Sequence, residues 1–278
     1  MILFPNAKIN LGLFVTGKRP DGYHDIATVM VPVGWRDVLE IVPSKGRQST
    51  LTVYGRGVDC PPEKNLVMKA FRAVSDFVGG LPPTDFYLEK IIPDGAGLGG
   101  GSADASFAIR GLNELYNLGL PDEVMARVAL TVGADCPFFI YNRPALCEGV
   151  GEKITLGVSP DIDGLSILIA KPAVASVSTR EAYAGVRPAP RSLDLAATVE
   201  LEPSQWNGVL ENDFEASVFP RLPQVAALKA FMLDNGARYA SMTGSGAAVF
   251  GIFENANLAQ RVADSLADCD KIVTSMIG

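Results

Sequence analysis

Alternating apolar and polar positions open the chain and predict a β-strand at residues 7–13. With the two-residue period of a strand, its apolar side chains share one face, and Lys8 and Asn10 share the other. Shorter apolar runs predict further strands at 38–42, 51–54 and 86–92, and a longer pattern predicts a helix at 65–77. The first half of the chain is therefore expected to mix strands and helices.

Proline and glycine punctuate the rest of the chain. Pro121 and Gly133 bracket one predicted helix, and Gly236 ends another at 223–235. A strand at 247–253, a helix at 258–267 and a strand at 271–275 follow, whereas residues 187–203 are expected to form a long surface connection. We therefore expect two α/β domains, at residues 1–155 and 156–278, the second being a small α+β sandwich.

A glycine-rich run that leads directly into a helical pattern is the most informative stretch of the sequence. Glycine adopts backbone angles closed to other residues, so several N–H groups of such a run can converge on one anion. The following helix, with Ser102 as its expected N-cap, adds the positive end of its dipole. The sequence therefore predicts a phosphate-binding loop, which consists of Pro93, Asp94, Gly95, Ala96, Gly97, Leu98, Gly99, Gly100, Gly101, Ser102 and Ala103.

Two known phosphate-binding templates fit this run poorly. Gly95, Gly97 and Gly100 match the dinucleotide pattern G-x-G-x-x-G, but that pattern belongs in the first βαβ unit, and here about a third of the chain precedes it. The Walker pattern requires a lysine after the glycines, and none is present. A flexible surface loop is the other alternative, although such loops seldom run straight into an amphipathic helix.

Composition limits the classes of protein and partner. The chain has 278 residues, of which 48% are hydrophobic, and no apolar run of membrane-spanning length or signal-peptide pattern is found. Four scattered cysteines without a C-x-x-C pair predict reduced thiols and a cytoplasmic location. A formal net charge of −7 argues against nucleic acid, and a single histidine, His24, excludes His-rich zinc sites.

Three spaced motifs resemble the GHMP small-molecule kinases: the strand that carries Lys8, the run 93–106, and the turn 243–246. Residues 7–11, 19–24, 133–139 and 212–215 narrow the resemblance to members that act on 4-diphosphocytidyl-2-C-methyl-D-erythritol in non-mevalonate isoprenoid synthesis. The resemblance spans nearly the whole chain. It implies a two-domain α/β (α+β) fold, with an N-terminal ribosomal-protein-S5-domain-2-like domain, a C-terminal ferredoxin-like α+β sandwich, and an active site in the cleft between them.

The resemblance implies an enzyme that uses ATP and Mg²⁺ to phosphorylate the 2-hydroxyl of this small-molecule substrate. Lys8 and Asp135 are the implied catalytic pair. The aspartate would accept the proton of the acceptor hydroxyl, and the lysine would keep that aspartate ionised and face the γ-phosphate. Without the resemblance, Lys8 would be interpreted as an exposed strand lysine, and for Asp135 a carboxylate that caps the turn after Gly133 would be as good an interpretation as a catalytic one.

The resemblance also assigns binding residues. Tyr23 would stack on the cytosine, His24 would hydrogen-bond the polar edge of the base, and Tyr183 would form a second aromatic wall. Further substrate contacts are expected from Asn10, Thr179, Gly244, Ser245 and Gly246. The loop 93–103 would surround the ATP phosphates, with Ser102 also reaching Mg²⁺, and the adenine and ribose would lie by Asn65, Leu66 and Lys90.

Some positions depart from the family pattern or have a different expected role. Asp94 places a carboxylate in a phosphate loop, so it is expected to point outward. Thr243 replaces an expected serine but keeps the hydroxyl. Residues 212–215 are expected to be structural, as a helix cap. The sequence identifies no carboxylate as the metal ligand, and it leaves the oligomeric state open.

Three alternatives stay open at this stage. Another GHMP kinase, with mevalonate, homoserine or a sugar as acceptor, would not need the Tyr23–His24 pair. A non-catalytic nucleotide sensor would have no reason to keep both Lys8 and Asp135. A nicotinamide-dependent oxidoreductase is the poorest fit, because the dinucleotide pattern lies in the wrong context.

Overall fold

The computed structural model describes residues 1–57 and 60–277, which form two compact units. Unit 1 comprises Met1–Ala7, Trp35–Asp94 and Gly99–Asn142, and unit 2 comprises Lys8–Gly34, Gly95–Leu98 and the chain from Arg143 onward. Each unit is thus assembled from separated stretches of sequence. The expected domain boundary at residue 155 stays a prediction.

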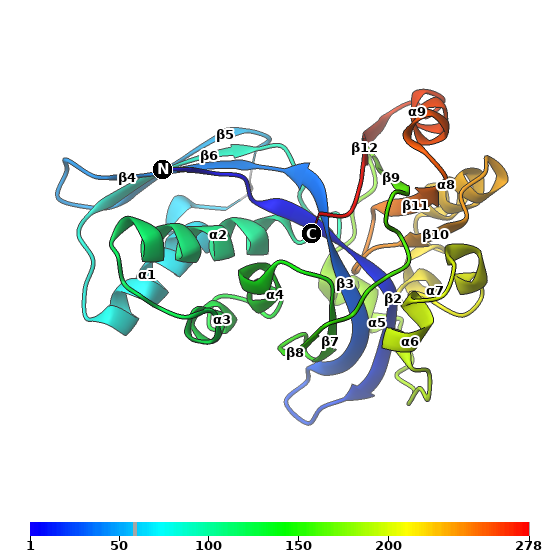
Figure 1. Ribbon diagram of the computed structural model, residues 1–278, viewed down its shortest axis with the longest axis horizontal. Coiled ribbons are helices and arrows are strands. Elements are labelled where there is room, and N and C mark those ends of the chain that lie inside the picture. Colours follow the sequence, from blue (N-terminus) through cyan, green and yellow to red (C-terminus); the bar gives the residue numbers. More distant parts are fainter. Residues whose placement is uncertain (58–59, 278) are drawn as a thin grey trace. The chain divides into compact units, whose positions relative to one another are not determined.

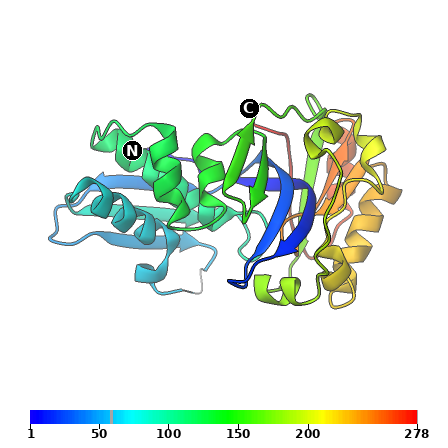
Figure 2. The same ribbon diagram turned by 90° about the horizontal axis from the view of Figure 1, so that it is seen from below.

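Unit 1 contains a sheet in the order β1-β4-β6-β5, with helices packed on it (Figures 1 and 2). Its β5 and β6 run parallel, which requires a crossover connection, here supplied by α1. Helices α1 to α4 and strands β4 and β6 share one apolar core. The elements are β1 Ile2–Leu3, β4 Val38–Pro43, β5 Thr50–Gly55, the 3₁₀ turn η1 Pro62–Lys64, α1 Leu66–Val78, β6 Thr84–Lys90, α2 Gly100–Leu115, α3 Asp122–Leu130 and α4 Cys136–Tyr141.

Local sequence explains where these helices begin and end. Asn65 caps α1 by accepting a hydrogen bond from the N–H of Val67 at 2.9 Å, and Gly79, with a left-handed φ, ends it. The predicted cap of the next helix is wrong: α2 begins at Gly100, and Ser102 already lies inside it. Gly99 is the N-cap and has a φ of 72°. Glycine adopts this left-handed conformation readily, whereas a serine at this position would be strained.

Unit 2 carries a long hairpin, β2 Asn6–Lys18 and β3 His24–Arg36, extended by β7 Ala145–Gly149 and β8 Lys153–Leu156. The strand predicted at 7–13 is confirmed, but its polar face is not exposed. Lys8 is 3% exposed and Asn10 is 1% exposed, so both faces of β2 are buried. A lysine and an asparagine at such depth require polar partners within the protein.

The C-terminal part of unit 2 forms a second sheet in the order β10-β11-β9-β12, with every neighbouring pair antiparallel. Helix α8 precedes β10 and α9 connects β11 to β12, which gives the split β-α-β arrangement of the ferredoxin-like fold and confirms that prediction. Side chains of α8 and α9 share a core with one face of this sheet (Figure 1). The elements are β9 Ser166–Pro172, α8 Pro223–Asp234, β10 Tyr239–Met242, β11 Val249–Phe253, α9 Ala256–Asp264 and β12 Cys269–Thr274.

The stretch between β9 and α8 corrects one expectation. Residues 187–203, predicted as a long surface connection, contain the helix α6 Leu195–Val199. Leu195 and Val199 are buried, so this short helix packs on the body of the unit. The other elements of the stretch are α5 Thr179–Ala184, the 3₁₀ turn η2 Pro203–Trp206 and α7 Glu215–Val218.

A buried ion cluster joins three elements of unit 1. The ammonium of Lys90, at the end of β6, donates to a carboxylate oxygen of Asp37 and, at 2.8 Å, to Oδ2 of Asp104 in α2. Asp37 also accepts from the N–H groups of Ile91 and Ile92, at 2.6 and 2.8 Å. The other oxygen of Asp104 is buried without a hydrogen-bond partner. Because burial opposes its charge, the pKa of Asp104 is raised to about 7.

This cluster predicts a pH-dependent difference in stability between the protein and its Asp104→Asn variant. The native carboxyl keeps its proton up to pH about 7, whereas the carboxyl of the unfolded chain releases it near the ordinary pKa of 3.8. The wild-type free energy of unfolding therefore loses up to about 1.4 kcal/mol per pH unit in this window, and the variant lacks that loss. Urea denaturation at pH 5, 6, 7 and 8 should show the variant gaining on the wild type as pH rises.

Asp85→Asn is the matched control, because hydrogen bonds from Thr50 lower the pKa of the Asp85 carboxyl. The Asp85 carboxylate stabilises the wild type above the pKa of the unfolded chain, and this stabilisation is lost in acid. The free energy of unfolding of the wild type should therefore rise relative to that of Asp85→Asn as pH rises from 3 to 5. A pH-independent difference between Asp104→Asn and the wild type would contradict the assignment.

Candidate active site

The glycine segment 95–98 of unit 2 packs against the turn 243–246 of the same unit. A methyl group on Gly97 would lie 2.1 Å from the carbonyl oxygen of Thr243, so only glycine fits there. Backbone hydrogen bonds hold the segment at both sides, from Ala248 N–H to Ala96 O at 3.2 Å and from Lys8 N–H to Leu98 O at 3.0 Å. The structure thus brings together two glycine motifs that lie far apart in the sequence.

Lys8 projects its ammonium into this junction. Its Nζ donates to Oδ1 of Asn10 at 2.7 Å and to the carbonyl oxygen of Gly97 at 2.9 Å. Both acceptors are oxygens of neutral amide groups, and these two contacts orient the ammonium. The cation is therefore held beside the glycine segment that was predicted to bind phosphate.

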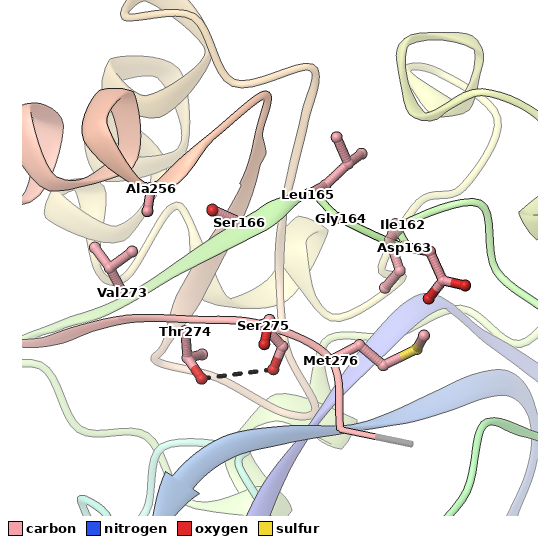
Figure 3. Close-up of a pocket in the computed structure, with 10 residues that line it drawn as sticks. All are labelled: Ile162, Asp163, Gly164, Leu165, Ser166, Ala256, Val273, Thr274, Ser275 and Met276. Atoms are coloured by element: carbon pink, nitrogen blue, oxygen red, sulfur yellow. Dashed lines mark hydrogen bonds between the residues drawn. The ribbon is translucent and has the colours of Figure 1, made fainter.

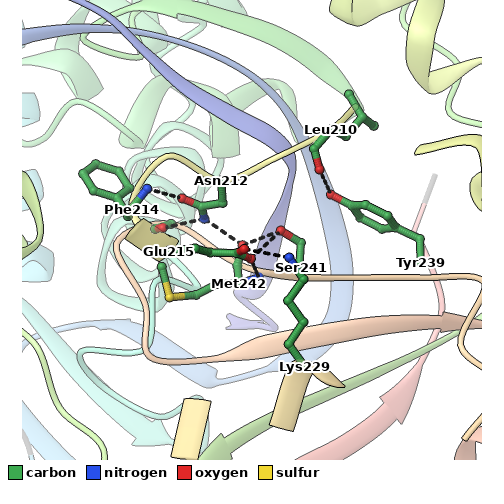
Figure 4. Close-up of polar contacts among 9 residues, drawn as sticks. Leu210, Asn212, Phe214, Glu215, Lys229, Tyr239, Ser241 and Met242 are labelled. Carbon is green, nitrogen blue, oxygen red and sulfur yellow. Dashed lines mark hydrogen bonds and ion pairs between the residues drawn. The ribbon is translucent and has the colours of Figure 1, made fainter. Parts of the chain in front are cut away.

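Asn212 and Glu215, which belong to a segment that the sequence predicted to be structural, make polar contacts with the backbone that leads into the turn 243–246 (Figure 4). Asn212 donates to the carbonyl oxygens of Met242 and Gly244, at 2.7 and 2.9 Å, and Glu215 accepts from the N–H of Met242 at 2.9 Å. The structural role is confirmed, but the expected helix cap is wrong. The N-cap of α7 is Phe214, which makes no side-chain cap bond.

Aromatic rings gather elsewhere in unit 2. His24 stacks on Tyr183 with ring centroids 4.8 Å apart, and Tyr183 meets Phe214 edge-on at 4.7 Å. Burial and the charge of Lys18 lower the pKa of His24, so its imidazole is neutral at pH 7 and can both donate and accept hydrogen bonds. Tyr23 is 65% exposed, which leaves its ring face open to solvent.

Two more predicted substrate contacts meet in this unit. The hydroxyl oxygens of Thr179, at the start of α5, and Ser245 lie 3.4 Å apart. Thr179 is exposed and Ser245 is partly exposed, whereas Gly244 and Gly246 are buried. Two solvent-accessible hydroxyl groups so close together are suited to donate hydrogen bonds to an oxyanion.

Asp135 belongs to unit 1, directly before α4. Ser106 of α2 donates to the carbonyl oxygen of Cys136 at 2.7 Å, which ties the helix after the glycine run to the residue after Asp135. Asp135 is half-buried and makes no side-chain cap bond at the start of α4. Burial raises the pKa of Cys136 to about 11, so this neighbouring thiol stays protonated and is a poor nucleophile.

The residues assigned to the nucleotide lie around the start of α2 in unit 1. Leu66 faces Gly101, and a methyl group on Gly100 would lie 3.3 Å from the ammonium of Lys90. Lys90 is buried, with the carboxyl groups of Asp37 and Asp104 bound to its ammonium. Asn65 is occupied as the cap of α1. Of the loop residues before α2, Pro93 is buried and Asp94 is exposed, which agrees with the expected outward position of that carboxylate.

A cavity of about 470 Å³ lies in unit 2 between the end of β12 and the segment before β9, lined by residues that include Asp163, Ser166 and Thr274 (Figure 3). None of the predicted site residues lines it. Among the residues that the structure describes, no group of three or more His, Cys, Asp or Glu side chains is arranged to hold a metal ion. Over the same residues, no helix is long and apolar enough to cross a membrane.

Sequence reasoning missed the buried partners of the predicted residues. Thr28 accepts a hydrogen bond from Asn10, and Asp37 and Asp104 bind Lys90. The available signal was weak: a threonine inside the apolar stretch 26–33 and an aspartate between two predicted strands. Which buried lysine or asparagine each of them meets depends on strand pairing, which a single sequence does not specify.

Comparison with protein families gives two matches in the order found in one known superfamily. The model for the GHMP kinases N terminal domain matches residues 65–143, and the model for the GHMP kinases C terminal domain matches residues 196–271. The first match contains the glycine run and Asp135, and the second contains the turn 243–246.

Relatives and solved structures agree with these matches. A 4-diphosphocytidyl-2-C-methyl-D-erythritol kinase of Parabacteroides distasonis is 48% identical over 91% of this chain and 92% of its own length. One of Porphyromonas gingivalis is 43% identical over 97% of both chains. A crystal structure of 4-(cytidine 5'-diphospho)-2C-methyl-D-erythritol kinase superposes with a TM-score of 0.83 at 31% identity over the full length of both chains. A homoserine kinase from Cytophaga hutchinsonii, with a TM-score of 0.74 at 19% identity over 98% of this chain and 94% of its own, shares the fold. The chain therefore belongs to the GHMP kinase family.

Proposed function

We propose that this chain transfers the γ-phosphoryl group of ATP to the 2-hydroxyl of 4-diphosphocytidyl-2-C-methyl-D-erythritol, in the non-mevalonate isoprenoid pathway. The observation that carries this proposal is the identity of 43–48% with relatives that bear the name of this kinase, over more than nine-tenths of the chain. The structure adds a lysine and two glycine motifs in one junction. The same proposal places the protein in the cytoplasm.

In this proposal Asp135 accepts the proton of the acceptor hydroxyl. The hydroxyl oxygen bonds to the γ-phosphorus of ATP, and the bond from that phosphorus to ADP breaks. The loss of that proton makes the oxygen a better nucleophile, and the loose transition state leaves charge on the equatorial oxygens. Lys8, whose ammonium is held beside the glycine segment by Asn10 and Gly97, is proposed to stabilise that charge.

The glycine loop is proposed to bind the ATP phosphates. The first N–H groups of α2 have no acceptor within the helix, and Gly97 and Gly99, with positive φ, turn the preceding backbone in ways closed to other residues. Asn65, Leu66 and Lys90 lie around the start of the same helix, which supports their assignment to the adenine and ribose. Two N–H groups of the Lys90 ammonium donate to Asp37 and Asp104. Its third N–H group and its aliphatic chain are therefore the parts that can contact the nucleotide.

Mg²⁺ is the cation expected with ATP. The Ser102 hydroxyl, in the first turns of α2, is an oxygen donor of the kind that Mg²⁺ prefers, so it is the protein group that would contact the ion. When bound, Mg²⁺ neutralises charge on the phosphates; such ions are held largely by the nucleotide and water, with few protein ligands.

The acceptor is proposed to bind through its cytosine and its phosphates. The exposed face of Tyr23 suits stacking on a base, and the neutral His24, backed by Tyr183, suits a hydrogen bond to the edge of the base. The hydroxyl groups of Thr179 and Ser245, with the turn from Gly244 to Gly246, suit the diphosphate. Asn10, which is 1% exposed, is proposed to act at the reacting end through its contact with Lys8.

The first test is a panel of acceptors offered to the purified protein with ATP and Mg²⁺. ADP release is expected with 4-diphosphocytidyl-2-C-methyl-D-erythritol and not with mevalonate, homoserine or galactose. Turnover with one of the others would keep the kinase and discard the substrate. Binding of ATP with no turnover on any acceptor would instead support a nucleotide sensor.

Asp135→Asn tests the proposed base. The amide cannot accept the proton, so kcat is expected to fall by roughly 100- to 10,000-fold, with the Kd for ATP unchanged within about threefold. Asp122→Asn, an exposed aspartate in the same unit, is the control and should keep wild-type turnover. Near-normal turnover by Asp135→Asn would remove Asp135 as the base.

Tyr23→Ala tests the proposed stacking on cytosine. Loss of one base–aromatic stack, worth about 1–3 kcal/mol, is expected to raise the KM for the cytidyl substrate by roughly 5- to 100-fold and to spare the KM for ATP. Tyr54→Ala is the matched control, because Tyr54 is a similarly exposed tyrosine in unit 1. Equal KM values for the two variants would contradict the role of Tyr23.

A further inference from the structure

Thr28, in the middle of β3, contacts the side chain of Asn10 in β2. Both residues are almost completely buried, with exposed fractions of 0% and 1%. The residues around Thr28 in its strand are aliphatic: Ile26, Val29 and Val31 are all buried. A valine would match the shape of this threonine in such surroundings, so the hydroxyl requires a separate explanation.

The hydroxyl of Thr28 has only one proton, and it donates that proton to the carbonyl oxygen of Gly12 at 2.5 Å. A carbonyl oxygen only accepts, so the hydroxyl can only accept from its other partner. That partner is Nδ2 of Asn10, at 3.0 Å. Thr28 therefore determines which end of the Asn10 amide is the NH₂ group.

The opposite end of the amide, Oδ1, then faces donors from three places. Nζ of Lys8 lies at 2.7 Å, the N–H of Gly244 at 2.9 Å and the hydroxyl of Thr243 at 3.1 Å. An ammonium and a backbone N–H can only donate. With the amide reversed, its NH₂ group would meet these donors, so the N–H of Gly244 would lose its acceptor and Lys8 would lose its contact with Asn10 in a buried site.

From this chain of contacts we propose that Thr28 is a positioning residue for phosphoryl transfer. It acts through the orientation of Asn10, which sets the place of the Lys8 ammonium and holds the turn 243–246. The proposal rests on the proposed function, because it assumes that Lys8 faces the transferring phosphoryl group. Thr28 itself touches neither the nucleotide nor the acceptor in this proposal.

Thr28→Val is the decisive variant, because it keeps the shape and removes the acceptor. A displaced Lys8 should lower kcat by roughly 10- to 100-fold, up to the cost of a misplacement by about 1 Å, with the KM for ATP within about threefold. Thr28→Ser restores the hydroxyl and should return kcat to within a few-fold of the wild type. On an Asn10→Ala background, Thr28→Val should lower kcat no further, since both residues act in one series.

Thr84→Val is the matched control for a merely structural hydroxyl. Thr84 is also 0% exposed in a strand, and its hydroxyl donates to Pro82 O at 2.9 Å and contacts the Tyr116 hydroxyl at 2.7 Å. This variant should lose stability in urea denaturation and keep the wild-type kcat. If Thr28→Val behaves like Thr84→Val, with lower stability and unchanged kcat, the positioning role is overturned.

A readout without substrate separates this proposal from the proposed function. In ¹⁵N-labelled protein, the side-chain amide signals of Asn10 should shift in Thr28→Val, return in Thr28→Ser and stay unchanged in Thr84→Val. If these shifts occur but the wild type phosphorylates none of the offered acceptors, the substrate assignment fails and the positioning contact stands. Unchanged Asn10 signals in Thr28→Val would overturn the positioning contact, whatever the substrate.

Discussion

The carbonyl oxygen of the Asn10 side chain is the acceptor on which the arrangement of unit 2 depends. It receives the ammonium of Lys8, the N–H of Gly244 and the hydroxyl of Thr243. In a medium of low polarity, the loss of a hydrogen bond to any of these donors is costly, so an acceptor that they share makes their positions interdependent. The hairpin β2–β3 and the two glycine motifs are therefore linked by one hydrogen-bond network.

In unit 1, a buried cluster of charged side chains links the segments around the glycine run. Lys90 ends β6 just before the glycine run, and its two carboxylate partners come from the residue before β4 and from the first turns of α2. Asp37 also binds the N–H groups of the two residues that lead into the run. The backbone on either side of the run is thus attached to the same buried cluster.

Much of this architecture could be predicted from the sequence, because it rests on local patterns. The strand at 7–13, the helix after Asn65 and the ferredoxin-like order follow from periodicity, capping residues and the sequence of elements. The start of α2 could not be placed, because Ser102 and Gly99 are both plausible caps until the backbone angles are known. The burial of Lys8 and the choice of Thr28, Asp37 and Asp104 as partners arise from pairing between distant segments, which no local pattern encodes.

The thiol of Cys136, the residue after the proposed base, is protected from reagents by its burial. Cys136 is fully buried, and its pKa of about 11 keeps the thiolate scarce at neutral pH. An alkylating reagent reaches such a sulfur only when the start of α4 opens, so the rate of its modification measures how often that opening occurs. Cys136 is therefore a built-in reporter of local motion next to Asp135, one that can be followed without altering a residue of the site.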